Sequence, residues 1–539
     1  MKQKLIRLTA SMIVMVMTAA LMPQQATGAN KKGNATADLS ALAYQFDAEY
    51  YYDVYNRRAR QESEPQVFKN KDIVIRSLTY DQLAYLLQQE GNYLILFGGV
   101  WSKQVRQAIP YINEYAKAYG ISEVYNFDFR LDGETEATDV ESLTNETRNP
   151  YGKLVTADEY NYLYGEIVER YLTNLDEWTA ESSESAKAVT WRRVSGQVSS
   201  HVARLQVPFL FLYNKDNAGR PIAFAIEGFD DNYKQDVHRL FHFIFERKLK
   251  IDTYTDSQYF ADALIENNNR GHAPKLYDIF GRDEQTNLNA VNYHQLRWLL
   301  SQPGNSVVLI AGAWCANSTA AFGPISDYAV ANQTQVYVFD DRLDGKHPID
   351  FWGYGRDRQF KSRDTRIPGR EGELNPNAYL YVDLIREQLP NMEVAGHGGP
   401  IYYLDAQGDT AKAPASQSPY LLAYNKDAGH IVAWYEKMLE VNEKNLRREL
   451  YLYTPENYRE YTDGVRRVLT AYAQRTGRPA VSDPAKTRRP LVDFDYIYEP
   501  PRQPRGQHPR QQPVKFTPKP WAGALPQQDN ACTPEDSQP

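Results

Sequence analysis

Apolar residues follow two different spacings along this chain, and the two spacings alternate. In "YDQLAYLLQ" and "YHQLRWLLS" they recur every three or four positions, which predicts helices, whereas "NYLILFGG" and "SVVLIAG" are short apolar runs typical of buried strands. Further helices are expected after Trp101 and Trp314, and further strands in "EVYNFDF" and "QVYVFDD". This order of elements predicts the α/β class, with a mixed central sheet and helices on both faces.

The pattern occurs twice because the chain repeats itself. The segment "TYDQLAYLLQQEGNYLILFGGVW", from Thr79, matches "NYHQLRWLLSQPGNSVVLIAGAW", from Asn292, without an insertion. The matches continue in "VYNFDFRLDG" and "VYVFDDRLDG", in "VPFLFLYNKD" and "SPYLLAYNKD", and in helical segments that precede both copies, "YQFDAEYYYDVYN" and "SQYFADALIENNN". The chain is therefore expected to be a tandem duplication of one domain, at residues 40–250 and 254–475.

The two ends of the chain differ in composition from its body. Residues 1–28 combine Lys2, Lys4 and Arg7 with the apolar run "LTASMIVMVMTAALM" and a small-residue cleavage site, which is typical of a secretory signal peptide. Residues 476–539 are rich in Pro, Arg and Gln, which predicts a disordered tail. We therefore expect an exported protein, either secreted, periplasmic or at the cell surface. No membrane span is expected, because no later apolar run approaches ~20 residues.

Composition removes several classes of function. The net charge of −7 is mild for 539 residues and no basic stripe is present, so we expect no nucleic-acid partner. His238 and His242 stand four apart on an expected helix without a third ligand nearby, and we interpret them as helix packing and expect no metal site. No cofactor is expected either, because "AGHGGP" around His397 lacks the flanking strand and helix of a phosphate-binding loop. The two cysteines, Cys315 and Cys532, cannot staple a chain of this length.

One short segment has distinctive chemistry. The motif "WCANS", Trp314 to Ser318, follows an expected strand and opens an expected helix. A strand ending in Asp comes later, and Pro419 directly precedes another strand. In this order of elements each copy resembles a thioredoxin-like domain, over most of its length. The resemblance implies two tandem thioredoxin-like domains.

The resemblance also implies roles for individual residues of the second copy. Cys315 would be the nucleophile, and Pro419, like Pro208 in the first copy, would be a cis-proline that faces the active-site position and shapes a peptide groove. Ser318 would donate a hydrogen bond to the thiolate. The residues lining the groove would be Trp314, Ala316, Asn317 and Ser418.

Three departures from the thioredoxin-like pattern limit this chemistry. Ser318 stands where the family has its second cysteine, so an internal disulfide cannot form. Leu309 stands where the family has a buried acid on the preceding strand. In the first copy, "WSKQV" has Ser102 in place of the cysteine itself. The first domain therefore has no thiol, and the second has a monothiol site.

Two interpretations of Cys315 stay open. At a helix start, backbone amides and the helix dipole stabilise a thiolate and lower the pKa of a cysteine from ~8.5 by up to several units. A second thiol must then resolve the mixed disulfide, and Cys532 on the flexible tail is our hypothesis for it. The alternative is that Cys315 is a small buried hydrophobic residue, as most free cysteines are. For Ser318 and Asn317 the alternative is the polarity usual in a first helical turn.

Two functions of different classes follow. The first is thiol-disulfide exchange or redox-linked client binding outside the cytoplasm, by a thiol-disulfide oxidoreductase or isomerase whose partner is a protein or peptide thiol or disulfide. The first domain, which lacks the cysteine, resembles the non-catalytic domains with which protein disulfide isomerases hold unfolded clients. The second function is a non-catalytic scaffold of two thioredoxin-like domains that recruits a surface partner. The sequence leaves open whether the protein is an enzyme.

Overall fold

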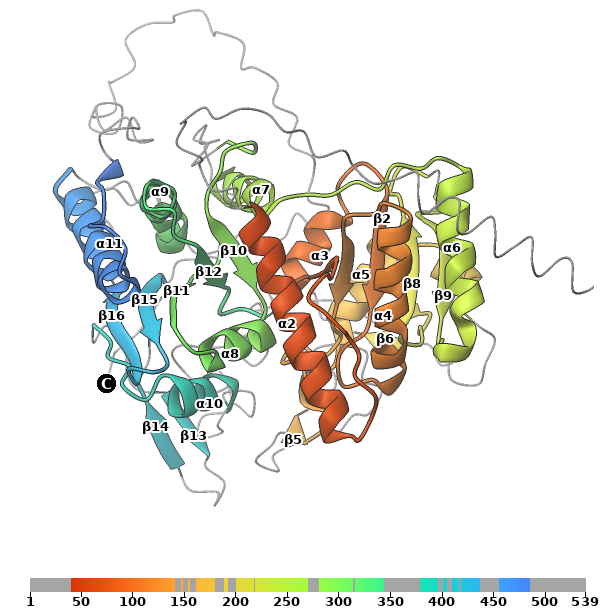
Figure 1. Cartoon of the computed structure of the whole chain (residues 1–539), viewed down its shortest axis with the longest axis horizontal. Helices are drawn as coiled ribbons and strands as arrows, with labels where there is room; N and C mark the ends of the chain where they lie inside the picture. The colour runs from red at the N-terminus through yellow and green to blue at the C-terminus, as the bar shows by residue number, and fades with distance from the viewer. Residues whose placement is uncertain are drawn as a thin grey trace, which may run out of the picture. The chain divides into compact units, whose positions relative to one another are not determined.

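The structure is a computed structural model of the whole chain (Figure 1). It describes residues 40–140, 147–148, 154–155, 161–179, 189–191, 200–217, 219–269, 281–313, 316–343, 379–395, 401–404, 410–414, 416, 418–436 and 455–484. Internal contacts divide the chain into Met1–Asp38 and Leu39–Pro539, and every described residue belongs to the second unit.

The first copy forms a five-stranded mixed sheet flanked by helices. Its strand order is β1-β3-β2-β8-β9, in which β1, β3 and β2 are parallel while β8 and β9 run antiparallel to their neighbours. Its elements are α2 (Ser40–Gln61), β1 (Ile75–Ser77), α3 (Tyr80–Leu86), β2 (Tyr93–Phe97), α4 (Lys103–Ala118), β3 (Val124–Phe127), η1 (Glu136–Thr138), β4 (Thr147–Arg148), β5 (Leu154–Val155), α5 (Asn161–Tyr171), η3 (Leu175–Glu177), β6 (Val189–Trp191), β7 (Ser200–Val202), β8 (Phe209–Tyr213), β9 (Ile222–Glu227), η4 (Asp231–Tyr233) and α6 (Lys234–Glu246). All residues of the central strand β2 are buried, as its continuous apolar run predicts.

The second copy repeats this sheet strand by strand. Its order is β10-β12-β11-β15-β16, with the same parallel and antiparallel neighbours. Its elements are α7 (Asp256–Asn269), β10 (Leu288–Val291), α8 (Tyr293–Ser301), β11 (Asn305–Ile310), α9 (Ala316–Ala331), β12 (Val336–Phe339), α10 (Tyr379–Gln388), β13 (Ile401–Leu404), β14 (Thr410–Ala413), β15 (Tyr420–Asn425), β16 (His430–Glu436) and α11 (Pro455–Thr476). The prediction of two tandem thioredoxin-like domains of the α/β class is confirmed by this strand order.

Matching caps begin the equivalent helices α3 and α8. The side chain of the cap, Thr79 or Asn292, accepts a hydrogen bond from the backbone amide three residues on, at Gln82 or Gln295. The glutamine side chain in turn accepts from the backbone amide of the cap. This capping box satisfies two amides that a helix start otherwise leaves unpaired, which explains why both helices begin at the same place in the repeat.

The sequence patterns did not predict the shortest strands. The edge strands β1 and β10 have three and four residues, and the ribbons β4–β5, β6–β7 and β13–β14 are of similar length. Runs this short show no periodicity, so hydrophobic spacing cannot distinguish them from loops. The omission matters because the carboxyl ends of β1 and β10 border a cavity between the copies.

Some predicted segments lie outside the described residues. The predicted signal peptide, residues 1–28, is one of them. The tail predicted at 476–539 is described only as far as residue 484, where Arg478 Nη1 donates to the carbonyl oxygen of Gln333 at 2.9 Å. Residues 476–484 of the predicted disordered tail are thus part of the described structure. The rest of that tail, residues 485–539, lies outside the described residues, where disorder stays a prediction. No helix in the described ranges is long and apolar enough to cross a membrane.

The first helix of each copy, α2 or α7, packs against the other copy. From α2, the hydroxyl of Tyr50 lies 3.0 Å from Nδ1 of His294, and its ring meets Trp298 edge to face at 5.7 Å. From α7, the hydroxyl of Tyr259 donates to Oδ2 of Asp81 at 2.7 Å. Asp81 and His294 are counterparts, each the second residue of its helix. The two domains therefore share a buried interface in which each contributes a helix to the other.

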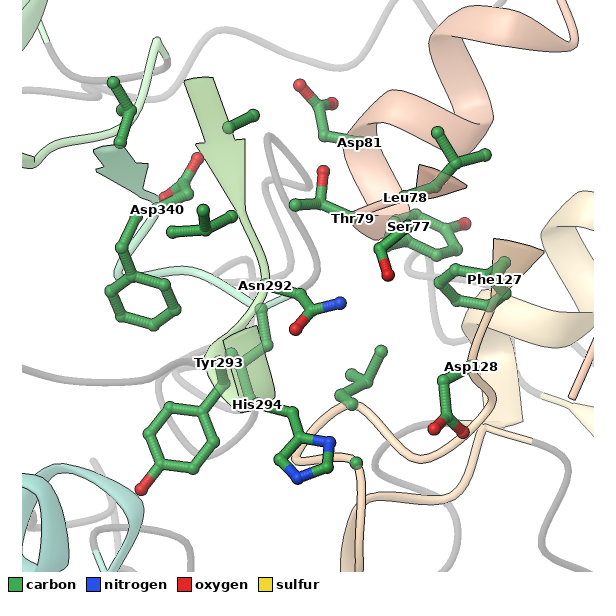
Figure 2. A pocket seen from close by; sticks show the side chains of 18 of the residues that line it. Ser77, Leu78, Thr79, Asp81, Phe127, Asp128, Asn292, Tyr293, His294 and Asp340 are labelled. Carbon is green, nitrogen blue, oxygen red and sulfur yellow. The ribbon is translucent and has the colours of Figure 1, made fainter. Parts of the chain in front are cut away.

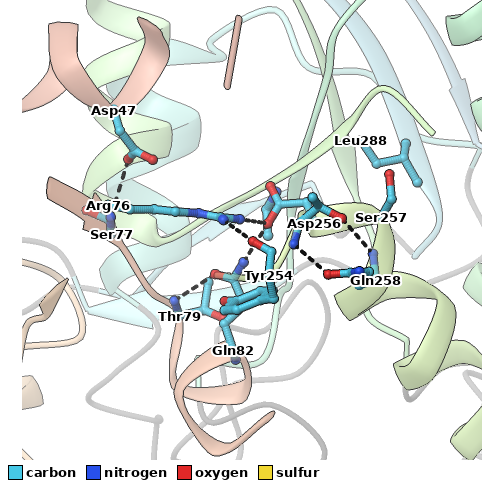
Figure 3. Close-up of polar contacts among 12 residues, drawn as sticks. Asp47, Arg76, Ser77, Thr79, Gln82, Tyr254, Asp256, Ser257, Gln258 and Leu288 are labelled. Atoms are coloured by element: carbon cyan, nitrogen blue, oxygen red, sulfur yellow. Dashed lines mark hydrogen bonds and ion pairs between the residues drawn. The ribbon is translucent and has the colours of Figure 1, made fainter. Parts of the chain in front are cut away.

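A charged cluster is buried in this interface (Figure 3). The Arg76 guanidinium pairs with Asp256 through Nη2 and donates from Nη1 to the carbonyl oxygen of Tyr254 at 2.6 Å. Nη1 also lies 3.6 Å from Oε2 of Glu123. Asp47 lies on the other side of the cluster, where its carboxylate accepts from the amide of Ser77 at 3.4 Å (Figure 3). The guanidinium of Arg76 therefore interacts electrostatically with three buried carboxyl groups, those of Asp256, Glu123 and Asp47.

The capping glutamines connect this cluster to both copies. Gln82 of the first copy donates from Nε2 to Oδ1 of Asp256 at 2.9 Å. Gln295 of the second copy donates from Nε2 to Oδ1 of Asp47 at 2.7 Å. Each glutamine thus caps a helix within its own copy. Its side chain also donates to an aspartate of the first helix of the other copy.

The pH dependence of stability should reveal the charge of Asp47. Burial raises the pKa of Asp47 to about 8, although the Arg76 guanidinium opposes this. Its unfolded pKa is ~3.9, so folding takes up a proton between these values and the free energy of unfolding falls as pH rises from ~4 to ~8. Asp47→Asn keeps the acceptor oxygen, and should raise stability at pH 8.5 by about 4 kcal/mol relative to its effect at pH 5.

Urea denaturation of both proteins at pH 5 and pH 8.5 measures this difference. The exposed Asp216 supplies the matched control, since Asp216→Asn should shift stability equally at both pH values. An Asp47→Asn variant whose effect does not change with pH would contradict a neutral carboxyl at this position.

Candidate functional site

The predicted thiol site lies between β11 and α9 of the second copy. Ala313 is the last described residue after β11, and helix α9 begins at Ala316. Trp314 and Cys315 lie outside the described residues, as does Cys532. For Ala316 and Asn317 only the helical backbone is described. The structure therefore describes the surroundings of the thiol, and the helix start predicted directly after Cys315 is present.

Ser318 lies in the first turn of α9 and is completely buried. Its side chain is 0 % exposed, and its hydroxyl forms no hydrogen bond with any described residue. An unsatisfied buried hydroxyl costs about 1–3 kcal/mol. The next residue, Thr319, donates from Oγ1 to the carbonyl oxygen of Ala313 at 3.2 Å, which fixes the helix start to the end of the strand.

The proline before the fourth strand of the sheet has the predicted geometry in both copies. The Ser418–Pro419 and Val207–Pro208 peptide bonds are cis, as the resemblance implied. Directly before this bond, Ser418 donates from Oγ to Oδ2 of Asp341 at 2.8 Å, and both side chains are buried. The structure thus brings one predicted groove residue, Ser418, into contact with an acid that the sequence interpretation did not include.

Asp341 is a site residue that the sequence interpretation missed. The position expected for a buried acid is Leu309, which is fully buried in β11 and pairs with Val338 and Leu421 in the neighbouring strands. Asp341 instead comes two residues after β12. The signal was present in the repeat, because "FDF" in the first copy corresponds to "FDD" in the second.

The first copy has apolar residues at the three corresponding positions. Val105, Val207 and Phe129 are the counterparts of Ser318, Ser418 and Asp341. Two of them adjoin the end of β2: a Cβ atom placed on Gly98 would lie 2.5 Å from Cγ2 of Val105 and 3.6 Å from Cβ of Val207. The fold therefore accepts apolar side chains at this place, and the polar set in the second copy is not required by the fold.

Ser102, the counterpart of Cys315, has a structural role in the first copy. It is the N-cap of α4, and its side chain accepts from the backbone amide of Val105 at 3.3 Å. A serine at this position satisfies a helix amide that would otherwise be unpaired. The first copy thus keeps the helix start and the cis-proline without thiol chemistry.

Comparison with known proteins adds little beyond the fold. No protein-family profile matches the chain, and no curated protein sequence matches it. Among solved structures, the chain is similar to crystal forms I and II of ERdj5, with 8% and 9% identity and a TM-score of 0.16 in each case. The match covers 68% of this chain but only 27% and 28% of the two ERdj5 chains. At these scores the likeness carries no argument about activity, and the fold rests on the strand order described above.

The paired histidines on α6 are engaged in packing contacts. Nε2 of His238 lies 2.9 Å from the hydroxyl of Tyr119, and Nε2 of His242 lies 3.0 Å from Oε1 of Glu246. The two imidazole rings are stacked at 6.1 Å. Within the described ranges no cluster of side chains suits a metal ion.

Proposed function

We propose that the second domain carries out monothiol thiol-disulfide exchange, with Cys315 as the nucleophile. The observation that supports this is the buried polar set Ser318, Ser418 and Asp341, at positions where the thiol-free first domain has apolar side chains. Ser418 and Asp341 bind each other, whereas burying the Ser318 hydroxyl costs stability unless it finds a partner. A thiolate next to the start of α9 would give Ser318 a partner that the first domain does not need.

The proposed exchange proceeds in two steps. The Cys315 thiolate attacks one sulfur of a client disulfide, a mixed disulfide forms, and the other client sulfur leaves as a thiolate that takes up a proton. A second thiolate then resolves the mixed disulfide. A client thiolate or a small thiolate attacks the client sulfur, forms a disulfide with it and displaces the Cys315 thiolate, whereas Cys532 attacks the Cys315 sulfur, forms a Cys315–Cys532 disulfide and displaces the reduced client. Ser318 cannot supply this thiol, so it comes from the client itself, from a small thiol or from Cys532.

Ser318 and Asp341 have different roles in this proposal. The Ser318 hydroxyl donates a hydrogen bond to the thiolate, which lowers the pKa of the thiol by favouring its charged form. Asp341 fixes the Ser418 hydroxyl next to the cis-proline, where a bound peptide would lie. Substrates with disulfides are found in exported compartments, which agrees with the predicted signal peptide.

The first domain supports a second candidate function, a binding scaffold without catalysis. Its Ser102 cap shows that the same fold and cis-proline persist without a thiol. In that case Cys315 would be a packed hydrophobic residue of the second domain, and both domains would recruit a partner through their surfaces.

Alkylation of Cys315 distinguishes the two functions. The rate of reaction with iodoacetamide is measured against pH in the mature protein carrying Cys532→Ser. The exchange proposal expects fast labelling with a titration midpoint near or below ~7, since a helix start lowers the pKa of a thiol. A midpoint of ~8.5 or above, or labelling only after unfolding, would reject the exchange reaction and leave the scaffold.

A further inference from the structure

A cavity lies between the two domains, and its lining includes Ala311 and Ala313, which directly precede the predicted thiol site (Figure 2). It is lined from the first copy by residues that follow β1 and β3, and from the second copy by residues that follow β10 and β12. The space inside it that the centre of a water-sized sphere can occupy is about 50 Å³. In α/β sheets, ligands bind outside the carboxyl ends of the parallel strands, and this cavity borders those ends in two sheets at once.

The cavity has corresponding residues on its two sides. Figure 2 shows Asp81 and Asp128 on the side of the first copy, with His294 and Asp340 on the side of the second. Asp128 and Asp340 are counterparts that directly follow β3 and β12, and each accepts a hydrogen bond from the backbone amide two residues on. The duplication thus places an equivalent carboxyl group on each side of one enclosed space.

Charged groups of both signs line the cavity. Three carboxyl groups line the cavity, together with the guanidinium groups of Arg130 and Arg342. The Arg130 side chain lies over the Trp101 ring at 4.1 Å and pairs with Glu136 at 3.2 Å, and neither of these partners lines the cavity. His294 adds no charge at neutral pH, because burial lowers its pKa to about 4.

Asp128 is held in place by two hydrogen bonds, and the charge of Arg130 also favours its ionised form. Its Oδ1 accepts from Nε1 of Trp101 at 2.7 Å and from the amide of Arg130 at 3.0 Å. Burial nevertheless raises the pKa of Asp128 to about 7. Gly99 allows the carboxyl group to sit here, since a Cβ at that position would lie 2.0 Å from Oδ2 of Asp128. A cation bound beside Asp128 would offset the desolvation of its carboxylate.

Tyr55 supplies an independent indication of a ligand. It lines the cavity with only 2% of its surface exposed, and its hydroxyl forms no hydrogen bond with any described residue. Burial and the negative charge of Asp128, which also lines the cavity, raise the pKa of Tyr55. The Tyr55 hydroxyl therefore offers a ligand in the cavity a group that can donate or accept a hydrogen bond.

We propose that this cavity binds a small organic cation with a primary ammonium group, held by Asp128 and Tyr55. An ammonium donates hydrogen bonds both to a carboxylate and to a phenol oxygen. The aromatic rings that line the cavity from both copies favour the same ligand, because the face of an aromatic ring attracts a cation. Residues of both domains line the site, and the proposed binding requires neither Cys315 nor Cys532.

Two sources provide this chemistry, a free aliphatic diamine and the lysine side chain of a peptide. Isothermal titration calorimetry on the full chain carrying Cys315→Ser, at pH 8 and low salt, uses 1,4-diaminobutane and Nα-acetyl-lysine amide as probes. Saturable binding of the first alone identifies a free diamine, and binding of the second identifies a lysine side chain. The neutral 1,4-butanediol has the length of the diamine without its charge, and it should not bind.

Two variants locate the binding. Asp128→Asn keeps the oxygen that accepts from Trp101 and Arg130, and should weaken binding of the ammonium by about tenfold or more, as expected for loss of a charged hydrogen bond. Tyr55→Phe should weaken it by about three- to tenfold. The surface change Asp216→Asn is the control and should leave the affinity unchanged. Absence of binding by both ammonium probes, or unchanged affinity in Asp128→Asn, would overturn the proposal.

Discussion

Replacing Arg76 by methionine is expected to lower the free energy of unfolding by about 3–5 kcal/mol, the usual cost of removing one partner from a buried ion pair. Methionine keeps much of the apolar stem of Arg76, whose side chain is 12% exposed, so packing is largely preserved. What is lost is the guanidinium that pairs with Asp256 and lies 3.6 Å from Glu123. Urea denaturation at pH 7.5 measures the change.

The control is an arginine that is paired but exposed. Arg220 forms an ion pair with Glu177, and its side chain is 66% exposed, so Arg220→Met should cost less than about 1 kcal/mol. The loss in Arg76→Met should also shrink as the pH falls, because burial raises the pKa of Asp256 and a protonated carboxyl group no longer needs a cation. Equal effects of the two arginine substitutions would show that the buried cluster does not stabilise the domain interface.

The repeat made the fold predictable, but it could not reveal how the two copies meet. Spacing and duplication identified the long helices and the central strands, because each of these is encoded within a short segment. The contacts of the interface join residues far apart in the chain, such as Gln295 with Asp47 and Gln82 with Asp256. No local pattern marks these residues, since a glutamine in a first helical turn is fully explained by its capping role.

The candidate site was predictable to a similar degree. Motif and resemblance indicated the helix start after Cys315 and the cis bond before Pro419, and both backbone features are present. Asp341 was missed because the resemblance directed attention to the strand that contains Leu309. Comparing the copies position by position would have found it, since an acid replaces Phe129 of the first copy within an otherwise similar segment.

That comparison also supplies the sharpest test of the thiol site, which is to give the second domain the residue of the first. Ser318→Val introduces the side chain that the first domain has as Val105, so the fold should tolerate it. If the Ser318 hydroxyl stabilises the thiolate, its loss should raise the pKa of Cys315 by about one unit, which slows alkylation at pH 7 about fivefold from a midpoint near ~7.

A second buried serine of the same helix provides the control. Ser326 lies further along α9, where its hydroxyl donates to the carbonyl oxygen of Thr286 at 2.9 Å, away from the helix start. Ser326→Val leaves that carbonyl without its donor and should lower stability, but it should not change the titration midpoint of Cys315. If Ser318→Val also leaves the midpoint unchanged, the buried polar set does not act on the thiol. The difference between the two domains would then concern the binding of a partner, and the scaffold would be the better account.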